Sequence, residues 1–235
     1  PELACRIRRQ FDRLELLRLE TRVTPLEKSD QGYVLQTPLG NVAARLVVAG
    51  PGTKPLELGI PGEREARAAH RLGYHVEELK AGYGEPVLVV GGGDVACDGA
   101  LALAGGHASP VTLVVRGNRL RAHGRLQAAV AADPGIRVAP HLPPREITVT
   151  KEGIRLYCGK EEGGTSLEAA ALLVAAGRVP ALDFLDPRIL RNHGDNTDFF
   201  LVGDAAHPRH RQVAMAMGDG MAAAMHIMIS RESET

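Results

Sequence analysis

Residues 87–96 read VLVVGGGDVA, an apolar run that leads directly into a glycine-rich turn. The next segment, 94–104, is rich in Ala and Leu and is predicted to be a helix, and residues 111–115 are predicted to be a strand. That strand begins about twenty residues after the glycines, which is the spacing that a β-α-β unit requires. The stretch therefore predicts an α/β fold built on a Rossmann-like unit.

The glycine turn also has the G-x-G-x-x-A spacing of a dinucleotide-binding site. Gly91 allows the tight turn, Gly93 allows a pyrophosphate to approach the backbone, and Ala96 lets the helix pack closely on the strand. The phosphates would lie on the free N–H groups of the helix N-terminus, where Asp94 and Val95 stand. We therefore predict that these five residues bind a dinucleotide; the alternative is a tight turn without a ligand.

Arginines follow the second predicted strand, at the place where an NAD site normally carries an acidic residue. They are Arg116, Arg119 and Arg121. The planar guanidinium group binds phosphate well, so Arg116 and Arg121 favour the 2′-phosphate of NADP over NAD. NAD remains an alternative, and a solvated basic loop is the interpretation without a ligand.

The composition narrows the class of protein. The chain has 235 residues, is 44% hydrophobic and only 3% aromatic, and so can build an aliphatic core. Basic and acidic residues number 28 each, which gives no general electrostatic basis for binding nucleic acid or an acidic membrane. We expect no apolar stretch long enough to span a bilayer. The scattered Cys5, Cys97 and Cys158 form no C-x-x-C pair and favour a reducing, cytoplasmic setting.

Several further elements follow from hydrophobic periodicity and turn residues. We expect helices over 3–14 and 212–230, strands at 16–23, 33–37, 42–48, 169–176 and 199–202, a hairpin over 147–158, and no regular structure at 50–62. The turn-rich segments predict domain boundaries, with residues 63–164 forming the NAD(P)-binding domain and residues 1–62 and 165–235 forming a second, discontinuous region.

Other motifs follow in a fixed order along the chain. They are GIPGE at 59–63, AGRVP at 176–180, VGD at 202–204, RQV at 211–213 and GDG at 218–220. Together with the glycine turn and the arginines, this set resembles the thioredoxin-reductase-like flavoproteins, which include ferredoxin–NADP reductases of the same fold. The resemblance implies a Rossmann-like NAD(P)-binding domain inserted into a partial FAD/NAD(P)-binding domain of the three-layer ββα type.

The resemblance also implies that three segments contact FAD. The first is Gly177 and Arg178, and the second is Gly203 and Asp204, which lie at the ribityl chain. The third lies against the isoalloxazine ring and comprises Arg211, Gln212 and Val213. In such enzymes hydride passes directly between nicotinamide and flavin, so no catalytic side chain is expected. No metal is expected either, because His207, His210 and His226 have no further ligands nearby in sequence.

The chain departs from the family pattern in three places. It begins without the glycine fingerprint that binds the ADP part of FAD, and residues 72–77, LGYHVE, hold no C-x-x-C. The third departure is the loop at 207–210, HPRH, which is more basic than the family pattern leads us to expect. In addition, Gly117 replaces one of the paired arginines of the NADP loop. We therefore expect an NAD(P)H-dependent flavoprotein oxidoreductase that passes electrons to an acceptor other than thioredoxin, such as ferredoxin, flavodoxin or another small electron-transfer protein.

Two alternatives remain. One is a flavin-free dinucleotide-binding module or subunit. The other places FAD or another nucleotide at the glycine turn, where the arginines disfavour FAD. The resemblance suggests a homodimer. If the first β-α-β unit of the FAD domain is absent, we expect strands at 46–49, 171–176 and 199–202 to lack neighbours. Cys97 is interpreted as a small buried residue, with a reactive thiolate as the alternative.

Overall fold

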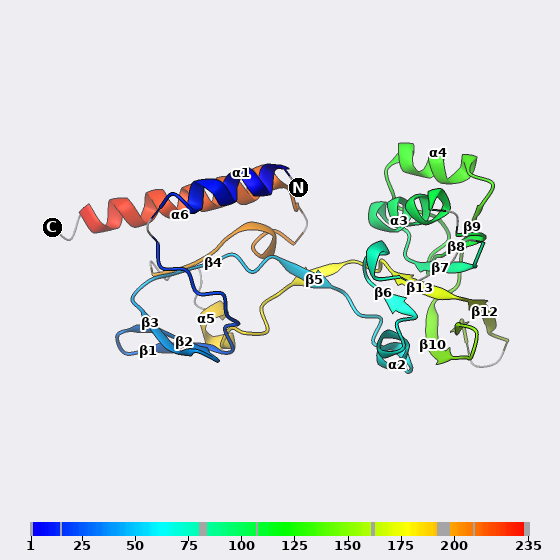
Figure 1. Ribbon diagram of the computed structural model, residues 1–235, viewed down its shortest axis with the longest axis horizontal. Helices are drawn as coiled ribbons and strands as arrows, with labels where there is room; N and C mark the ends of the chain where they lie inside the picture. The colour runs from blue at the N-terminus through cyan, green and yellow to red at the C-terminus, as the bar shows by residue number, and fades with distance from the viewer. Residues whose placement is uncertain are drawn as a thin grey trace. The chain divides into compact units, whose positions relative to one another are not determined.

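The computed structural model describes residues 2–14, 16–79, 84–106, 108–160, 163–191, 198–208 and 210–232 (Figure 1). The chain divides into two compact units, which we call the central unit, 53–179, and the terminal unit, 1–52 with 180–235. The sequence places the boundaries at 62/63 and 164/165 instead. The two divisions differ because the strands at 165–169 and 171–174 pair with strands of the central unit.

A parallel sheet of five strands forms the middle of the central unit. Its order is β6 (Leu72–Gly73), β13 (Ala171–Val174), β7 (Val87–Val90), β8 (Val111–Val114) and β9 (Ile136–Ala139). These strands are rich in Val, Leu and Ile, as is typical of strands that are covered on both faces. Because the strands are parallel, their carboxyl ends meet at one edge of the sheet.

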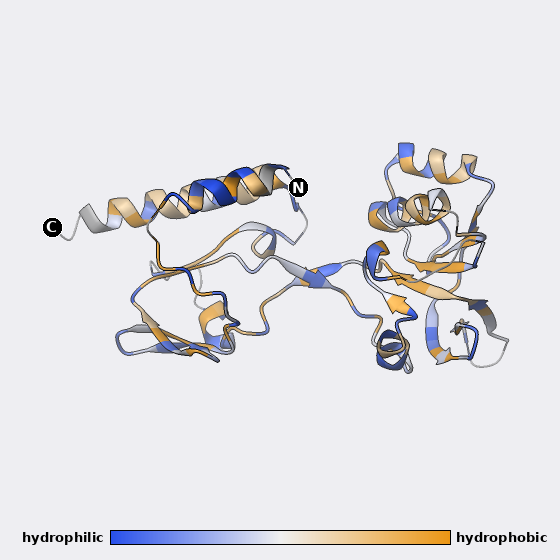
Figure 2. Cartoon of the chain, viewed as in Figure 1, coloured by the Kyte–Doolittle hydropathy of each residue, from blue (hydrophilic) through white to orange (hydrophobic). Residues whose placement is uncertain are grey.

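Side chains alternate between the two faces of this sheet and meet different partners on each. On one face, Val87, Val89 and Leu113 pack against α3 (Asp94–Gly105) and α4 (Gly124–Ala132). On the other face, Leu88, Val90 and their neighbours pack against an antiparallel sheet and against α2 (Glu63–Ala68). That second sheet has the order β10 (Pro144–Val149), β11 (Ile154–Cys158) and β12 (Thr165–Ala169). The central unit is therefore a three-layer arrangement with apolar strands inside (Figure 2).

The GIPGE motif places a buried carboxylate at the start of α2. Glu63 accepts backbone N–H groups from Leu58 at 2.9 Å and Gly59 at 2.7 Å, and the Tyr74 hydroxyl at 3.0 Å. Burial, and then the charge of Glu63, raises the pKa of Tyr74. The motif thus closes the loop before α2 through three hydrogen bonds to one side chain.

The terminal unit has a smaller core. Its antiparallel sheet has the order β1 (Leu26–Ser29), β2 (Gly32–Thr37) and β3 (Gly40–Ala44), and β4 (Val47–Ala49) pairs in parallel with β15 (Phe199–Leu201). Leu26, Tyr33, Phe199 and Ile189 are fully buried, the last on α5 (Pro187–Arg191). The Tyr33 hydroxyl donates a hydrogen bond to Asp198 at 2.9 Å. The unit also contains α1 (Glu2–Phe11), η2 (Gly203–Ala205) and α6 (Val213–Glu232).

Three strand expectations were wrong. Residues 16–23 form no strand, and Leu17 is 89% exposed, because this segment has no pairing partner among the described residues. The expected strand at 42–48 divides into β3 and β4, since the chain leaves the antiparallel sheet and joins the parallel pair. The segment 50–62 contains β5 (Thr53–Pro55), which pairs with β14 (Arg178–Pro180).

The three parallel strands that we expected to lack neighbours differ in their pairing. Within the described part of the chain, β4 and β15 pair only with each other. The expectation is wrong for β13, which lies between β6 and β7 in the five-stranded sheet. The strand belongs to the central unit, which supplies both of its neighbours.

The helix α6 corrects the expectation about membrane-spanning length. Its segment Val213–Ser230 is long and apolar enough to cross a membrane by length and composition, and only 6% of it is buried. Ala and Met supply this hydropathy, without a run of Leu, Ile or Val. Near its middle, however, Asp219 accepts a hydrogen bond from the Gly203 N–H at 2.8 Å, which ties the helix to η2.

Candidate dinucleotide site

The turn between β7 and α3 brings two backbones into close contact at Gly91. Its φ is 150°, and a Cβ atom there would lie 2.4 Å from the carbonyl oxygen of Ala175 and 2.9 Å from Cβ of Ala96. The Gly91 N–H also donates to the carbonyl oxygen of Val114 at 3.1 Å. Only glycine fits this position without a shift of the backbone, and the small Ala96, which is fully buried, completes the close approach of helix and strand.

Gly93 leaves the N-terminus of α3 open. It is the residue before the helix, its backbone is extended, and a Cβ atom there would meet nothing within 4 Å. Within the described residues no side chain caps this end of α3. The first N–H groups of a helix lack partners inside the helix, and the helix dipole favours an anion there. The glycine turn and the open N-terminus of α3, which we call the phosphate cradle, therefore fit the pyrophosphate of a dinucleotide.

Asp94 and Val95, the first two residues of α3, have different surroundings: Asp94 is hydrogen-bonded within the protein and Val95 is exposed. One Asp94 carboxylate oxygen accepts the backbone N–H of His123 at 2.7 Å, so the side chain holds the loop that precedes α4. Val95 is 63% exposed at the first turn of α3. Their contact with a dinucleotide stays a prediction.

The arginine loop after β8 lies against the glycine turn. The Arg121 N–H donates to the carbonyl oxygen of Gly92 at 2.6 Å, and a Cβ on Gly92 would lie 3.1 Å from Val115. Arg116, Arg119 and Arg121 are all exposed. The structure thus brings the predicted phosphate cradle and the predicted arginines together at the carboxyl edge of the sheet, the edge where ligands bind in open α/β sheets.

Sequence reasoning missed one residue of this edge. His141 follows β9, is exposed, has a φ of 60°, and donates its N–H to the carbonyl oxygen of Gly117 at 2.8 Å. A lone histidine between Pro140 and Leu142 carries no sequence signal for such a position. Its position results from backbone hydrogen bonding between the loop after β9 and the loop after β8, which are distant in sequence.

Gly177 and Arg178 lie where β14 pairs with β5. The Arg178 guanidinium donates from Nε to the Thr53 hydroxyl and from a terminal nitrogen to the Thr53 carbonyl oxygen, both at 2.8 Å. The Gly177 carbonyl accepts the N–H of Leu56 at 3.0 Å. These contacts join the two segments of chain at the boundary of the central unit. The FAD contact that the resemblance implies for this pair stays a prediction.

The remaining predicted residues lie in the terminal unit, at the start of α6. Gly203 has a φ of 72°, and its N–H donates to Asp219, which the His207 ring also contacts at 3.0 Å. These two partners lower the pKa of the Asp219 carboxyl. The network fixes η2, which carries the half-buried Asp204, against the helix that begins at Val213, directly after Arg211 and Gln212.

The thiols of the central unit are buried. Cys97 is fully buried on α3, which confirms its interpretation as a packing residue, and burial together with Asp94 and Asp98 raises the pKa of its thiol. Burial raises the pKa of the Cys158 thiol to about 11. Both shifts oppose formation of a reactive thiolate. No group of metal-binding side chains occurs among the residues that the structure describes.

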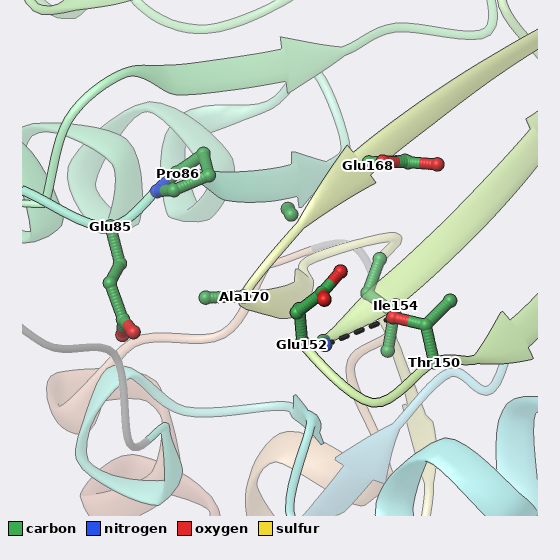
Figure 3. Close-up of a pocket in the computed structure, with 9 residues that line it drawn as sticks. Glu85, Pro86, Thr150, Glu152, Ile154, Glu168 and Ala170 are labelled. Carbon is green, nitrogen blue, oxygen red and sulfur yellow. Dashed lines mark hydrogen bonds between the residues drawn. The ribbon is translucent and has the colours of Figure 1, made fainter.

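A separate pocket of about 220 Å³ opens at the amino edge of the parallel sheet (Figure 3). Its rim carries Glu85, Glu152 and Glu168, and the Thr150 hydroxyl accepts the N–H of Gly153 at 3.0 Å. Glu168 is engaged by the Arg155 guanidinium, with Nε at 2.8 Å. The acidic rim and its position opposite the carboxyl edge distinguish this pocket from the dinucleotide site.

Comparison with solved structures supports the fold. The structure superposes on thioredoxin reductase from Lactococcus lactis with a TM-score of 0.84, 23% sequence identity, and coverage of 99% of this chain and 81% of that chain. Thioredoxin reductase from T. acidophilum gives a TM-score of 0.77 at 18% identity, covering 98% and 80% of the two chains. At these identities the likeness concerns the fold alone.

Curated relatives carry three different names. A ferredoxin–NADP reductase from Streptococcus equi is 30% identical over 231 residues, covering 91% of this chain and 69% of that protein. An NADH dehydrogenase from Ferdinandcohnia aciditolerans is 28% identical, and a thioredoxin reductase from Dictyostelium discoideum is 29% identical; the matches cover 96% and 78% of this chain. The chain spans only 46% and 62% of the length of the latter two.

A family match covers most of the chain. Residues 16–220 match the family described as pyridine nucleotide-disulphide oxidoreductase, a range that contains the glycine turn, the arginine loop and η2. The fold, the glycine turn and this match agree, and the chain belongs to the pyridine nucleotide-disulphide oxidoreductase family.

Proposed function

We propose that this chain forms the nucleotide-binding part of an NAD(P)H-dependent flavoprotein oxidoreductase that passes electrons to an acceptor other than thioredoxin. One observation carries the proposal: the glycine turn at Gly91, where a Cβ would meet the Ala175 carbonyl, lies beside an arginine loop held by the Arg121–Gly92 hydrogen bond. A phosphate cradle and a basic loop at one sheet edge are what a phosphorylated dinucleotide requires.

The preferred dinucleotide is NADP. The pyrophosphate would lie on the open N-terminus of α3 at Gly93, and the exposed Arg116 and Arg121 would bind the 2′-phosphate. NAD has no group for these arginines to bind. Because Gly117 supplies no side chain, discrimination depends on fewer charges than a paired-arginine loop provides.

The terminal unit fits the flavin end of FAD. Asp204 is half-buried, and the hydrogen bond from Gly203 to Asp219 fixes the turn that carries it. A fixed carboxylate is suited to accept hydroxyl groups of a ribityl chain. When both cofactors are bound they supply hydride transfer from nicotinamide to flavin, and the protein contributes binding and orientation.

The acceptor is proposed to be a small electron-transfer protein such as ferredoxin or flavodoxin. The sequence has no C-x-x-C, and Cys97 and Cys158 are buried with raised thiol pKa values, so a dithiol relay finds no support. A homodimer in the cytoplasm is part of the same proposal.

A second candidate is a flavin-free dinucleotide-binding module. It is favoured by the contrast between the five-stranded parallel sheet of the central unit and the two described parallel strands of the terminal unit. The central unit contains every residue of the candidate dinucleotide site. Such a module would bind NADP without carrying flavin.

An absorption spectrum separates the two candidates. The purified 235-residue chain is mixed with excess FAD, passed through gel filtration, and measured between 300 and about 550 nm before and after NADPH is added. Retained flavin bands that NADPH bleaches are the result expected for the oxidoreductase. A colourless protein that still binds NADP would contradict flavin binding by this chain and support the module.

A further inference from the structure

The parallel ladder between β8 and β9 is interrupted at its carboxyl end. Val114 pairs with Ala139, and the Val115 N–H donates to the Ala139 carbonyl at 2.9 Å. A regular parallel ladder would continue with the His141 N–H donating to the Val115 carbonyl. Instead the Leu142 N–H donates to that carbonyl at 3.0 Å. His141 is therefore an extra residue, inserted where the strand of β9 would continue the ladder.

The backbone of the extra residue is hydrogen-bonded to the arginine loop. His141 has a left-handed φ of 60°, and its N–H donates to the Gly117 carbonyl oxygen at 2.8 Å. Bulges of this kind are frequent next to binding sites, where they redirect a side chain. A left-handed backbone is uncommon outside glycine and has a conformational cost, and residues in such conformations cluster at functional sites.

The position of His141 matches a gap in the basic loop. Gly117 stands between Arg116 and Asn118 and has no side chain to offer a phosphate. His141 is hydrogen-bonded directly to that glycine, is exposed, and stands two residues beyond the end of β9, as Arg116 stands two residues beyond the end of β8. The backbone of His141 is therefore next to the residue from which a side chain is missing, and a Cβ atom on Gly117 would meet nothing within 4 Å, which leaves this place open.

We propose that His141 is a specificity-determining residue, which donates an imidazole N–H to the 2′-phosphate of NADP and takes the place of a side chain at Gly117. The inference rests on the proposed NADP preference and extends it to a segment outside the family's arginine loop. An imidazole has at least one N–H in either protonation state, so the contact needs no charge on the ring.

The test measures binding of 2′,5′-ADP and of 5′-AMP to the full chain by calorimetry, because these probes differ only in the 2′-phosphate. His141→Gly removes the ring and suits a left-handed backbone. His70→Gly is the matched control, since His70 is an exposed histidine with a φ of 57° that precedes β6 at the opposite, amino edge of the sheet. His141→Arg tests whether a longer donor restores the contact.

We expect His141→Gly to weaken binding of 2′,5′-ADP about tenfold, as for the loss of a hydrogen bond to a charged group, and to leave binding of 5′-AMP unchanged. His70→Gly should leave both unchanged, and His141→Arg should keep the preference. If the wild-type chain prefers 2′,5′-ADP and His141→Gly retains that preference in full, the role of His141 is refuted while the NADP proposal stands. If the wild-type chain binds both probes equally, the NADP proposal fails and the role of His141 fails with it.

Discussion

The two units differ in how completely they cover their own apolar surface. In the central unit every residue of β7 is buried, and layers of structure lie on both faces of the sheet. In the terminal unit α6 exposes a row of methionines, Met217, Met221, Met225 and Met228, and the parallel pair β4–β15 has no further described strand beside it. The candidate dinucleotide site therefore stands on a core that is covered on both faces, whereas the segments proposed to contact flavin stand on a unit whose described apolar surface is only partly covered.

The largest expected effect is in the core of the central unit. Leu113→Ala should cost about 3 kcal/mol of unfolding free energy, because Leu113 is fully buried in β8 and the cavity cannot close completely. Met221→Ala is the matched change in the terminal unit and should alter stability by less than about 0.5 kcal/mol, since Met221 is 65% exposed. Urea unfolding followed by circular dichroism compares them. A cost for Met221→Ala close to that of Leu113→Ala would show that α6 is covered in solution and would remove the contrast.

The next effect separates folding from binding at the glycine turn. Gly91→Ala should destabilise the chain by about 2 kcal/mol, because the new Cβ would lie 2.4 Å from the Ala175 carbonyl oxygen. Gly93→Ala should leave stability nearly unchanged, since its Cβ meets nothing within 4 Å, but should weaken NADP binding by obstructing the pyrophosphate. Thermal unfolding and calorimetric titration on the same samples check both halves. Undiminished NADP affinity in Gly93→Ala would place the pyrophosphate elsewhere.

The smallest effect concerns the attachment of α6 to η2. The pKa of Asp219 is lowered in the folded chain, chiefly by the Gly203 N–H and then by His207. Its contribution to stability is therefore complete above the unfolded-state pKa of about 3.9 and is lost as pH falls through the lower folded-state value. Amide hydrogen exchange at Gly203 should accelerate in that acid range relative to amides of the central unit. Asp219→Asn should show the faster exchange already at neutral pH, and equal exchange in both proteins would contradict the contact.

The sequence correctly predicts those elements that are specified by residues close together along the chain. The glycine spacing, the apolar run before it and the strand after it specify one β-α-β unit, and the structure contains it as β7, α3 and β8. The arginines could be located because they follow the second strand directly. The boundaries could not, because β12 and β13 join the central unit through pairing with β11 and β7, strands that are distant from the boundary in sequence.

Contacts between distant segments account for the other differences. Nothing near Arg178 in sequence indicates that Thr53 accepts its guanidinium hydrogen bonds, and nothing near His141 indicates the extra residue in the ladder. Segment 16–23 has apolar residues but finds no partner strand in the described chain, so the hydrophobic pattern alone predicts a strand that does not form. Pairing, more than propensity, decides such cases.

The NADP proposal depends most directly on whether the glycine turn at Gly91 and the arginine loop bind one phosphorylated dinucleotide together. Calorimetric titration of the purified chain with NADP⁺ and with NAD⁺, at one fixed salt concentration, measures the two affinities without requiring flavin. We predict that NADP⁺ binds at least about tenfold more tightly, and that Arg116→Ala removes most of the difference. Equal affinity for the two nucleotides, or no binding of either, would contradict the assignment of this sheet edge as an NADP site.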